Sequence, residues 1–436
     1  SITLADSGLD VTLVEKSESL GGNLRHVYFL AEGLNPQRLL RDLINRVRGH
    51  HRIQVITRGT VNKVSGSLGQ FKSVIVQQSE FGELSNIDIE HGVVIIATGG
   101  VEGSTNQYLR SEDDRVITQL ELEDWLIHDP EKIMRLNNLV MVQCVEAQEI
   151  GRFYCSRTCC TSTMKNAIRL KMMNPDCQVT VLYRDIITYG FREQYYTEAR
   201  ERGVVFVRYS EDNSPVVESL NGKLQVTIED PSLSNRQYQL PADLLCLSMP
   251  IVPSEGTERI ADLFGVPLSD EGFYLEADLK MRPMDFVNEG IFMCGMAHYP
   301  RFIEESIASA QAAAGRAITI LSQQPMFVGG IIAEVDPDLC VGCLTCVRTC
   351  PFTIPKIKFD RAGVGELGGY AWIDPALCQG CGTCTGECPA TAINLVNFTD
   401  EQMLGDPSWL GSWLPDSTSE IHQTSELADL TPEMSD

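Results

Sequence analysis

The sequence predicts an α/β protein of several domains that ends in a small, cysteine-rich module. Three observations support this prediction. A strand-like run, Val11–Val14, ends in Glu15 after an apolar helical stretch, as in the second half of a βαβ dinucleotide-binding unit. A second pattern of strand, loop and helix begins near Asn138. Two closely similar cysteine runs follow, at 340–351 and 378–389.

Composition sets the broad class of protein. Of the 436 residues 43% are hydrophobic, which is enough for ordinary globular cores in several domains. Apolar runs of about 18 residues are absent, so we expect no membrane span, and the N-terminus lacks the pattern of a secretory signal. The net charge of −24 argues against nucleic acid and anionic lipid as partners. We therefore expect a cytoplasmic protein, in a reducing compartment, whose partners are proteins.

Residues 1–119 are expected to form the first part of a nucleotide-binding domain. Glu15 stands at a strand end, where such domains place the acidic residue that binds a ribose hydroxyl. Gly21 and Gly22 follow closely and permit a close backbone approach to a pyrophosphate. The usual G-x-G-x-x-G should lie upstream of Ser1, so we expect the chain to be a fragment. A βα pair without a ligand is the alternative.

Two later stretches agree with nucleotide binding. The run "HGVVIIATGG" is an apolar strand that closes in Thr98-Gly99-Gly100. The run "EGIFMCGMAHYPRFIEES" predicts a buried strand at Ile291–Cys294, then Gly295, a loop and a helix that begins near Glu304. The start of such a helix directs N–H groups at an anion or an electron-rich ring. We assign residues 246–325 to the closing part of the same domain.

Residues 120–245 repeat the order of strand, loop, helix and strand, with the helix from about Arg157 to Met173. A nicotinamide-binding loop would be rich in glycine, whereas this loop contains Gly151 alone, so we expect no NAD(P)H here. The loop and helix start contain four thiols instead, at a place where the helix dipole favours anionic sulfur: Cys144, Cys155, Cys159 and Cys160. An iron–sulfur cluster, a disulfide, a zinc site and buried cysteines without a role are the alternatives.

The C-terminal cysteine runs give the most specific signal. "CVGCLTCVRTCP" and "CQGCGTCTGECP" both match C-x2-C-x2-C-x3-C-P, the bacterial ferredoxin pattern for two four-iron clusters, and zinc is a remote alternative. In this pattern the fourth cysteine of each run binds the other cluster. We assign Cys340, Cys343, Cys346 and Cys388 to one cluster, and Cys378, Cys381, Cys384 and Cys350 to the other. This α+β module is expected to span residues 326–400.

Three cysteines and the C-terminal segment remain. Cys177, Cys246 and Cys294 lie in or beside apolar runs, where cysteine is usually a small buried hydrophobe. Residues 401–436 are acidic and contain no Lys or Arg, which is typical of a poorly ordered tail. Trp409 and Trp413, four residues apart, could form a short helical anchor for a partner.

The motifs resemble known families. Glu15-Lys16, Gly21-Gly22, residues 97–100 and residues 290–317 resemble the FAD-binding domain of two-dinucleotide-domain flavoproteins of the thioredoxin reductase type. The set "QCV…YCSRTCC…KNAI", followed by "VLYRDI", resembles the heterodisulfide reductase A-subunit family, and this resemblance extends to about residue 400. It implies FAD and a third [4Fe–4S] cluster, held by the four thiols of the inserted domain. The run "GGNLRHVYFLAEG" departs from many members because it lacks cysteines.

The resemblance also assigns residues to the flavin site. They are Glu15, Lys16, Gly21, Gly22, Asn23, Val61, Ala97, Thr98, Gly99, Gly100, Gly295, Pro300, Glu304, Glu305 and Ser306. Arg301 would stabilise a reduced, anionic flavin, with a solvated surface arginine as the alternative. Cys294 lies in a loop that should pass near the flavin. His298 and Tyr299 precede Arg301, and a lone histidine is more often structural than catalytic.

Together these parts predict an electron-transfer subunit, in which FAD exchanges electron pairs and three [4Fe–4S] clusters each carry one electron. The resemblance implies subunits of a redox complex as partners: heterodisulfide reductase B- and C-like chains, a hydrogenase or dehydrogenase module, ferredoxin, and a second copy of the chain. It also implies flavin-based electron bifurcation as one function. Two alternatives stay open, a relay or confurcating subunit for a quinone-linked or aromatic-ring reductase, and a docking scaffold with a vestigial nucleotide domain.

Overall fold

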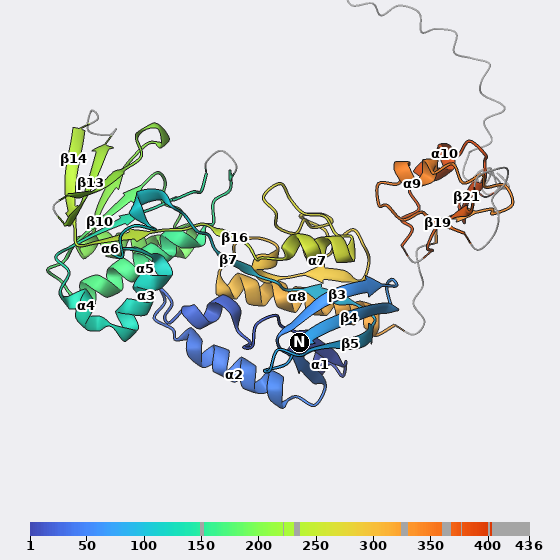
Figure 1. Ribbon diagram of the computed structural model, residues 1–436, viewed down its shortest axis with the longest axis horizontal. Coiled ribbons are helices and arrows are strands. Elements are labelled where there is room, and N and C mark those ends of the chain that lie inside the picture. The colour runs from blue at the N-terminus through green and yellow to red at the C-terminus, as the bar shows by residue number, and fades with distance from the viewer. Residues whose placement is uncertain are drawn as a thin grey trace, which may run out of the picture. The chain divides into compact units, whose positions relative to one another are not determined.

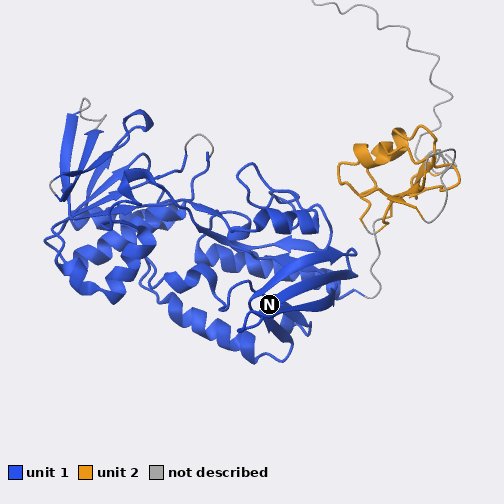
Figure 2. Cartoon of the chain, in the orientation of Figure 1, with its two compact units in different colours: residues 1–324 blue, residues 325–436 orange. Residues whose placement is uncertain are grey.

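The computed structural model describes residues 1–148, 152–220, 222–230, 236–323, 330–359, 368–375, 377–399 and 402. The chain divides into two compact units, residues 1–324 and 325–436 (Figure 2). Unit 1 contains two lobes. We call residues 1–102 and 251–323 the flanking lobe, and residues 116–247 the inserted lobe. Within the described ranges, no helix has the length and apolar character needed to cross a membrane.

Parallel strand pairs from distant parts of the sequence form the centre of the flanking lobe. Strand β1 (Val11–Val14) pairs with β2 (Ile53–Ile56), and β6 (Val94–Ile96) pairs with β17 (Ile291–Met293). Helix α2 (Pro36–Gly49) connects β1 to β2, and the side chain of its N-cap residue Asn35 accepts the Gln37 N–H. The carboxyl ends of these strands carry the loops of the predicted flavin site.

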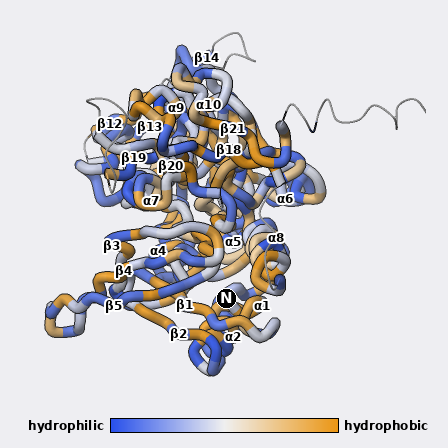
Figure 3. Tube along the Cα trace, turned by 90° about the vertical axis from the view of Figure 1, so that its right-hand side faces the viewer, coloured by the Kyte–Doolittle hydropathy of each residue, from blue (hydrophilic) through white to orange (hydrophobic). Residues whose placement is uncertain are grey.

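Other elements cover these strands (Figure 1). Strands β3 (Gly59–Ser65), β4 (Phe71–Gln78) and β5 (Leu84–His91) form an antiparallel sheet. Helix α8 (Ile303–Leu321) packs Ala313, Ala314 and Ala317 into a core with Phe292 and with Leu4 of helix α1 (Ile2–Asp6). The small alanine side chains allow close packing. The apolar residues of α8, β1 and β2 are orange in Figure 3. Helix α7 (Thr257–Phe264) lies in the same lobe.

The inserted lobe is a Rossmann-like layer structure. Five parallel strands have the order β11-β10-β9-β15-β8; in chain order they are β8 (Val116–Thr118), β9 (Asn138–Val142), β10 (Gln178–Tyr183), β11 (Val205–Arg208) and β15 (Leu244–Leu247). In β9 the residues after Asn138 are at most 2% exposed, as expected for a strand that is covered on both faces. The sheet begins and ends outside the predicted limits 120 and 245, because β8 is too short to give a clear pattern.

One face of this sheet packs against helices, and the other packs against a small antiparallel sheet (Figure 1). The helices are α3 (Gln119–His128), α4 (Pro130–Met134), α5 (Thr158–Met173) and α6 (Glu193–Glu201). The small sheet comprises β12 (Val216–Leu220), β13 (Lys223–Asp230) and β14 (Arg236–Ala242). Helix α5 begins one residue after the predicted start at Arg157, which is its N-cap.

Two antiparallel strands connect the lobes, β7 (Gly100–Glu102) leading out and β16 (Ile251–Pro253) leading back. At Gly100 a Cβ atom would lie 2.9 Å from Ile251 Cγ2 and 3.0 Å from the Val252 carbonyl oxygen. Both distances are shorter than a normal contact. Position 100 therefore requires glycine for the connection to form.

Unit 2 has the repeated pattern expected of two homologous halves. Strand β18 (Ile332–Val335) pairs with β21 (Ile393–Val396), and β19 (Lys356–Lys358) pairs with β20 (Tyr370–Trp372). Short helices α9 (Thr345–Thr349) and α10 (Thr383–Gly386) each follow the second cysteine of a run. The predicted tail lies outside the described residues apart from Gln402, and the anchor at Trp409 and Trp413 lies wholly outside them.

Candidate redox site

The four thiols of the inserted lobe meet where β9 ends and α5 begins. Cys144 follows β9 by two residues, and Cys159 and Cys160 lie in the first turn of α5. Cys144 and Cys160 are 7% and 1% exposed, while Cys155 and Cys159 are partly buried. The sulfurs are near enough for the charges of Cys160 and Cys155 to act on Cys144, and the Cys159 thiol donates to Cys160. The structure thus brings together the four residues that the sequence singles out.

The loop that carries these cysteines takes glycine-like backbone conformations without glycine. Positive φ angles occur at Cys144 (58°), Glu146 (50°), Gln148 (58°) and Arg157 (58°). Each such residue costs about 1–3 kcal/mol, and this cost is typical of functional loops. Arg184 offsets part of it, because its guanidinium donates to the carbonyl oxygens of Cys144 (3.0 Å), Ala147 and Gln148 (3.4 Å). The loop is therefore held in a shape that its own side chains do not favour.

The chemistry of the four thiols fits a site that a cation completes. Burial raises the pKa of Cys144 to about 11 and also raises the pKa of Cys155. The pKa of Cys159 is raised because its thiol donates to Cys160. The pKa of Cys160 is lowered because Cys159 and the Ile187 N–H (3.4 Å) donate to its sulfur. Iron ions would supply the positive charge that buried thiolates need.

The cysteines of unit 2 form two crossed groups. Cys340, Cys343, Cys346 and Cys388 line one cavity, although Cys388 belongs to the second run. Cys384 is within reach of the charges of Cys378, Cys381 and Cys350, which is the fourth cysteine of the first run. Backbone N–H groups donate to three sulfurs: Ala371 to Cys340 (3.3 Å), Ala333 to Cys378 (3.2 Å) and Ala392 to Cys388 (3.4 Å). Such bonds tune the potentials of clusters.

Among the described residues of either unit, the geometry of a site for a single metal ion is not found. In the described part of the chain, no group of three or more Cys, His, Asp or Glu side chains is arranged to hold one metal ion. This holds for the ferredoxin-type runs as well as for the cysteine loop. A four-iron cluster spaces its cysteine sulfurs more widely than one tetrahedral ion does, so this finding does not distinguish the two sets.

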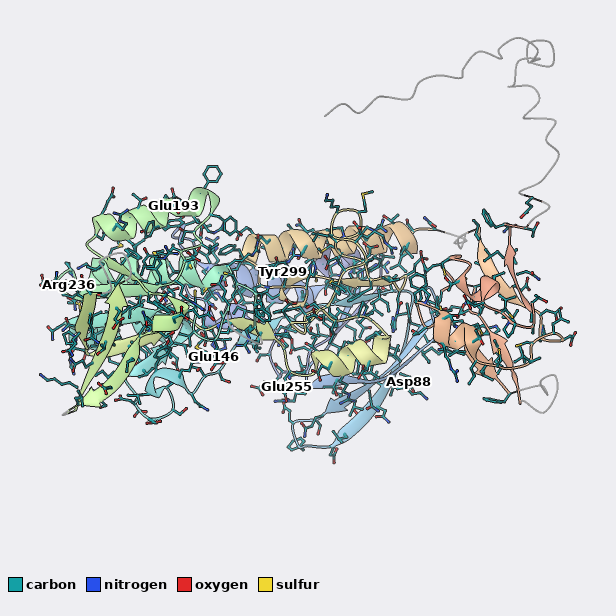
Figure 4. All side chains as sticks on the ribbon, turned by 90° about the horizontal axis from the view of Figure 1, so that it is seen from above. Asp88, Glu146, Glu193, Arg236, Glu255 and Tyr299 are labelled. Atoms are coloured by element: carbon teal, nitrogen blue, oxygen red, sulfur yellow. The ribbon has the colours of Figure 1, made fainter. Side chains whose placement is uncertain are left out.

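Arg157 joins the cysteine loop to the start of α8. Its backbone N–H donates to Cys155 Sγ (3.3 Å), and its Nη2 donates to Glu305 Oε2 (2.7 Å) and to the Pro300 carbonyl (3.2 Å). Its guanidinium carbon lies 5.2 Å from the centre of the Tyr299 ring, which Figure 4 labels near the start of α8. Two residues assigned to the flavin site, Pro300 and Glu305, therefore contact the loop that carries the thiols.

Arg301 is held by a partly buried chain of hydrogen bonds. Its Nη2 lies 2.6 Å from His298 Nδ1, and His298 Nε2 lies 2.8 Å from Glu276 Oε2. Arginine can only donate, so His298 Nδ1 accepts and Nε2–H donates to Glu276. Burial lowers the pKa of both His298 and Arg301, and Arg301 Nε is buried without a partner. Arg301 is therefore a fixed charge rather than a freely solvated side chain, and His298 orients it.

Several other candidate flavin residues gather at strand ends of the flanking lobe. The Glu15 carboxylate accepts the Ser17 N–H (2.8 Å), Asn23 Nδ2 donates to the Gly100 carbonyl (2.5 Å), and the Gly295 N–H donates to Ser309 Oγ (2.9 Å). The loops after β1 and β6 are thus tied together through Asn23 and Gly100. Gly21, Gly22, Gly99 and Gly295 all have positive φ angles, which glycine permits.

Some candidates have other partners. Lys16 pairs with Glu255 (3.2 Å), Glu304 pairs with Arg192, and Val61 lies in β3 opposite Ile75. Ala97 and Thr98 follow β6, and the Thr98 carbonyl accepts from Ser254 Oγ (2.9 Å). Ser306 lies in the first turn of α8, where its N–H donates to the Phe302 carbonyl.

The cysteines outside the predicted clusters are buried. Cys177 and Cys246 are 0% exposed, as expected for small hydrophobes. Cys294 is 8% exposed, packs with the alanines of α8, and has a pKa that burial raises. Its environment is that of a core residue beside the loop of Gly295.

The sequence alone did not mark four residues of the site as functional: Arg157, Arg184, Tyr189 and Glu276. Arg157 stands inside the "YCSRTCC" motif, so its position among the thiols was the one available signal. The other three lie far along the chain from the groups that they contact.

Comparisons with known proteins agree with this geometry. Two family models described as "4Fe-4S binding domain" match residues 332–355 and 371–394. A relative from Methanosarcina acetivorans, the A subunit of a "Ferredoxin:CoB-CoM heterodisulfide reductase", is 28% identical over 84% of this chain and 60% of its own. A relative from Methanothermobacter thermautotrophicus, the A subunit of an "H(2):CoB-CoM heterodisulfide,ferredoxin reductase", is 32% identical over 65% of this chain and 45% of its own.

The chain is similar to several proteins named as A subunits of heterodisulfide reductases. The chain spans about half the length of the two relatives described above. A solved structure of Lactococcus lactis thioredoxin reductase has a TM-score of 0.52 and 15% identity, and the match covers 74% of this chain and 94% of that one. The thioredoxin-reductase-like fold class predicted from the sequence is therefore confirmed, and the two 4Fe–4S segments follow that fold in the chain.

Proposed function

We propose that this protein is the electron-transfer subunit of a heterodisulfide-reductase-like complex, with one FAD and three [4Fe–4S] clusters. The first two clusters belong to the crossed cysteine groups of unit 2, and the third to Cys144, Cys155, Cys159 and Cys160. When bound, FAD supplies exchange of electron pairs and each cluster supplies exchange of single electrons. The donor and the acceptor, among them ferredoxin, a hydrogenase or dehydrogenase module and the B- and C-like chains, would belong to partner subunits.

One observation carries the proposal, the contact between the cysteine loop and the start of α8. Arg157 bonds to Cys155 Sγ on one side and to Glu305 on the other, so the thiol site and the candidate flavin site share a residue. Arg157 and Arg301 place two positive charges at this junction, where burial and, to a smaller extent, the charge of Arg157 lower the pKa of Arg301. Fixed positive charge favours the reduced states of neighbouring redox groups.

Iron, acid-labile sulfide and flavin per chain test the proposal on anaerobically purified full-length protein. We expect about twelve irons, from three four-iron clusters, and one FAD. Cys159→Ser should lower the iron content to about eight and leave FAD unchanged. Cys177→Ala is the matched control, because Cys177 is buried but lies outside the thiol group. Eight irons in the unmodified protein would remove the cysteine loop from the list of ligands.

The electron donor and bifurcation need separate tests. Reduced ferredoxin should bleach the flavin absorbance, while NADH should not, because the inserted lobe carries thiols where a nicotinamide loop would carry glycine. Bifurcation requires the two one-electron potentials of the flavin to be inverted. The electron that leaves the half-reduced flavin must then be a stronger reductant than the electron that leaves the fully reduced flavin. A redox titration of the flavin measures the order of the two one-electron potentials, and potentials in the normal order would exclude bifurcation.

A further inference from the structure

A buried ion pair lies between two helices of the inserted lobe. Lys165 of α5 and Glu123 of α3 are 2.7 Å apart (Nζ to Oε2), and their side chains are 8% and 2% exposed. A buried charge without its partner is strongly unfavourable, so each of these residues requires the other. Nothing in the proposed function uses this pair, yet Lys165 lies on α5, the helix that begins with the thiols.

The pair binds a segment of the other lobe. Glu123 Oε1 accepts the backbone N–H groups of Tyr28 (2.7 Å) and Phe29 (3.3 Å), and Lys165 Nζ donates to the Phe29 carbonyl (2.8 Å). The Phe29 ring lies 4.8 Å from Lys165 Nζ, and Phe29 and Ala31 pack against the core of the inserted lobe. The Tyr28 hydroxyl donates to Asp124 (2.9 Å). We call Tyr28, Phe29, Glu123 and Lys165 the latch.

The latch connects both halves of the candidate site. Tyr28 lies five residues after Asn23, in the segment that continues from the candidate flavin loop. Lys165 lies five residues after Cys160 on the same helix. If the lobes moved apart, Lys165 would lose the Phe29 carbonyl, and the two N–H groups would lose Glu123. The connecting strands β7 and β16 are only three residues each, and the ion pairs of Arg157 with Glu305 and of Arg192 with Glu304 also join the two lobes.

We propose that Lys165 and Glu123 are positioning residues that lock the inserted lobe against the flanking lobe and so hold the thiol site at one fixed separation from the start of α8. The consequence for electron transfer rests on the proposed function, because the rate of transfer falls steeply as redox groups separate. The lock itself does not depend on bound iron or flavin.

Hydrogen–deuterium exchange of the full chain, read by mass spectrometry, tests the lock. In Lys165→Met we expect peptides that contain Tyr28 and Phe29, and those that cover residues 100–103, to exchange at least about tenfold faster. Peptides from β9 and β10 should not change. Glu123→Gln keeps an oxygen acceptor for the N–H groups of Tyr28 and Phe29 but leaves the buried Lys165 charge unpaired, so it should also speed exchange at the same places. Lys132→Met is the control, since its ion pair with Asp129 is about half exposed in the same lobe.

Two results would overturn the lock. If residues 28–29 exchange faster while residues 100–103 stay protected, Lys165 and Glu123 bind the segment of Tyr28 and Phe29 but do not fix the position of one lobe against the other. If β9 and β10 exchange faster to the same degree, the pair serves general stability. Iron and flavin contents of the variants are measured on the same samples. A low iron count in the unmodified protein would count against the proposed function and leave the exchange result standing.

Discussion

At the residue scale, fixed charges define the junction between the thiols and α8. Arg157 contributes its backbone N–H to a sulfur and its guanidinium to Glu305, while Arg301 is oriented by His298. Arginine suits both positions because it stays charged and donates in a planar fork. Lysine at either position would keep the charge and lose the geometry.

Replacement of Arg157 tests this role. Arg157→Ala should lower the free energy of unfolding by about 1–3 kcal/mol, because Glu305 loses its charged partner, and should make the potential of the neighbouring redox group more negative. Arg157→Lys should leave the potential of the neighbouring redox group nearly unchanged, because the charge remains, and should lower the free energy of unfolding by less than Arg157→Ala does. Chemical denaturation measures the first effect and an anaerobic redox titration the second. Equal potentials in the two variants would contradict an electrostatic role for Arg157.

Glu102, in strand β7, gives a prediction on pH. Burial raises the pKa of its carboxyl to about 7 from the ordinary value of 4.5, against the opposing effect of a hydrogen bond from Thr118. The folded protein therefore binds this proton more tightly than the unfolded chain does. The contribution of Glu102 to stability is thus fully present below pH 4.5 and is lost as the pH rises through about 7.

The neutral variant Glu102→Gln should remove this dependence. The free energy of unfolding of the variant should match that of the unmodified protein near pH 4.5 and exceed it by about 3 kcal/mol at pH 8. Thermal unfolding across the window measures the difference. A difference between the two proteins that is the same at every pH would show that Glu102 does not titrate in this way.

At the scale of elements, two glycines differ in the space around them: a side chain would meet close neighbours at one position and none at the other. Gly100 in β7 faces Ile251 and the Val252 carbonyl, whereas Gly315 in α8 has no atom within 4 Å of the added Cβ. Gly100→Ala should destabilise the protein by about 1–3 kcal/mol through overpacking. Gly315→Ala should stabilise it by about 0.5–1 kcal/mol, because alanine favours the helix. Denaturation midpoints compare the two, and loss of stability in both would contradict the contacts described for α8.

The elements also show what the sequence could and could not predict. Strands with continuous apolar runs, such as Leu139–Val142, and the helix to Met173 have clear periodic patterns and are found as expected. The short strand β8 is not marked by its pattern, and its place in the sheet depends on pairing with β15, which lies far along the chain. Cysteine spacing predicted which thiols would gather, because metal ligands impose spacing. Arg184 and Glu276 could not be found, since their partners come from distant segments.

At the scale of the whole molecule, the crossed cysteine groups tie the two halves of unit 2 together. Cys350 and Cys388 each lie among the cysteines of the other run. Cys388→Ser should therefore impair the site of Cys340, Cys343 and Cys346 rather than the site of its own run, with loss of about four irons. Iron analysis together with spectra of the remaining clusters identifies which site is lost. Loss of the site of Cys378 instead would contradict the crossed arrangement.

The paired connecting strands have a consequence for how such a protein can change during evolution. Because β7 leaves the flanking lobe beside the point where β16 returns, the inserted lobe is attached through a single neck. A domain joined in this way can be exchanged or remodelled without disturbing the fold of its host, provided that the neck is kept. The inserted lobe could thereby change its own loops and side chains while the flanking lobe kept its connectivity.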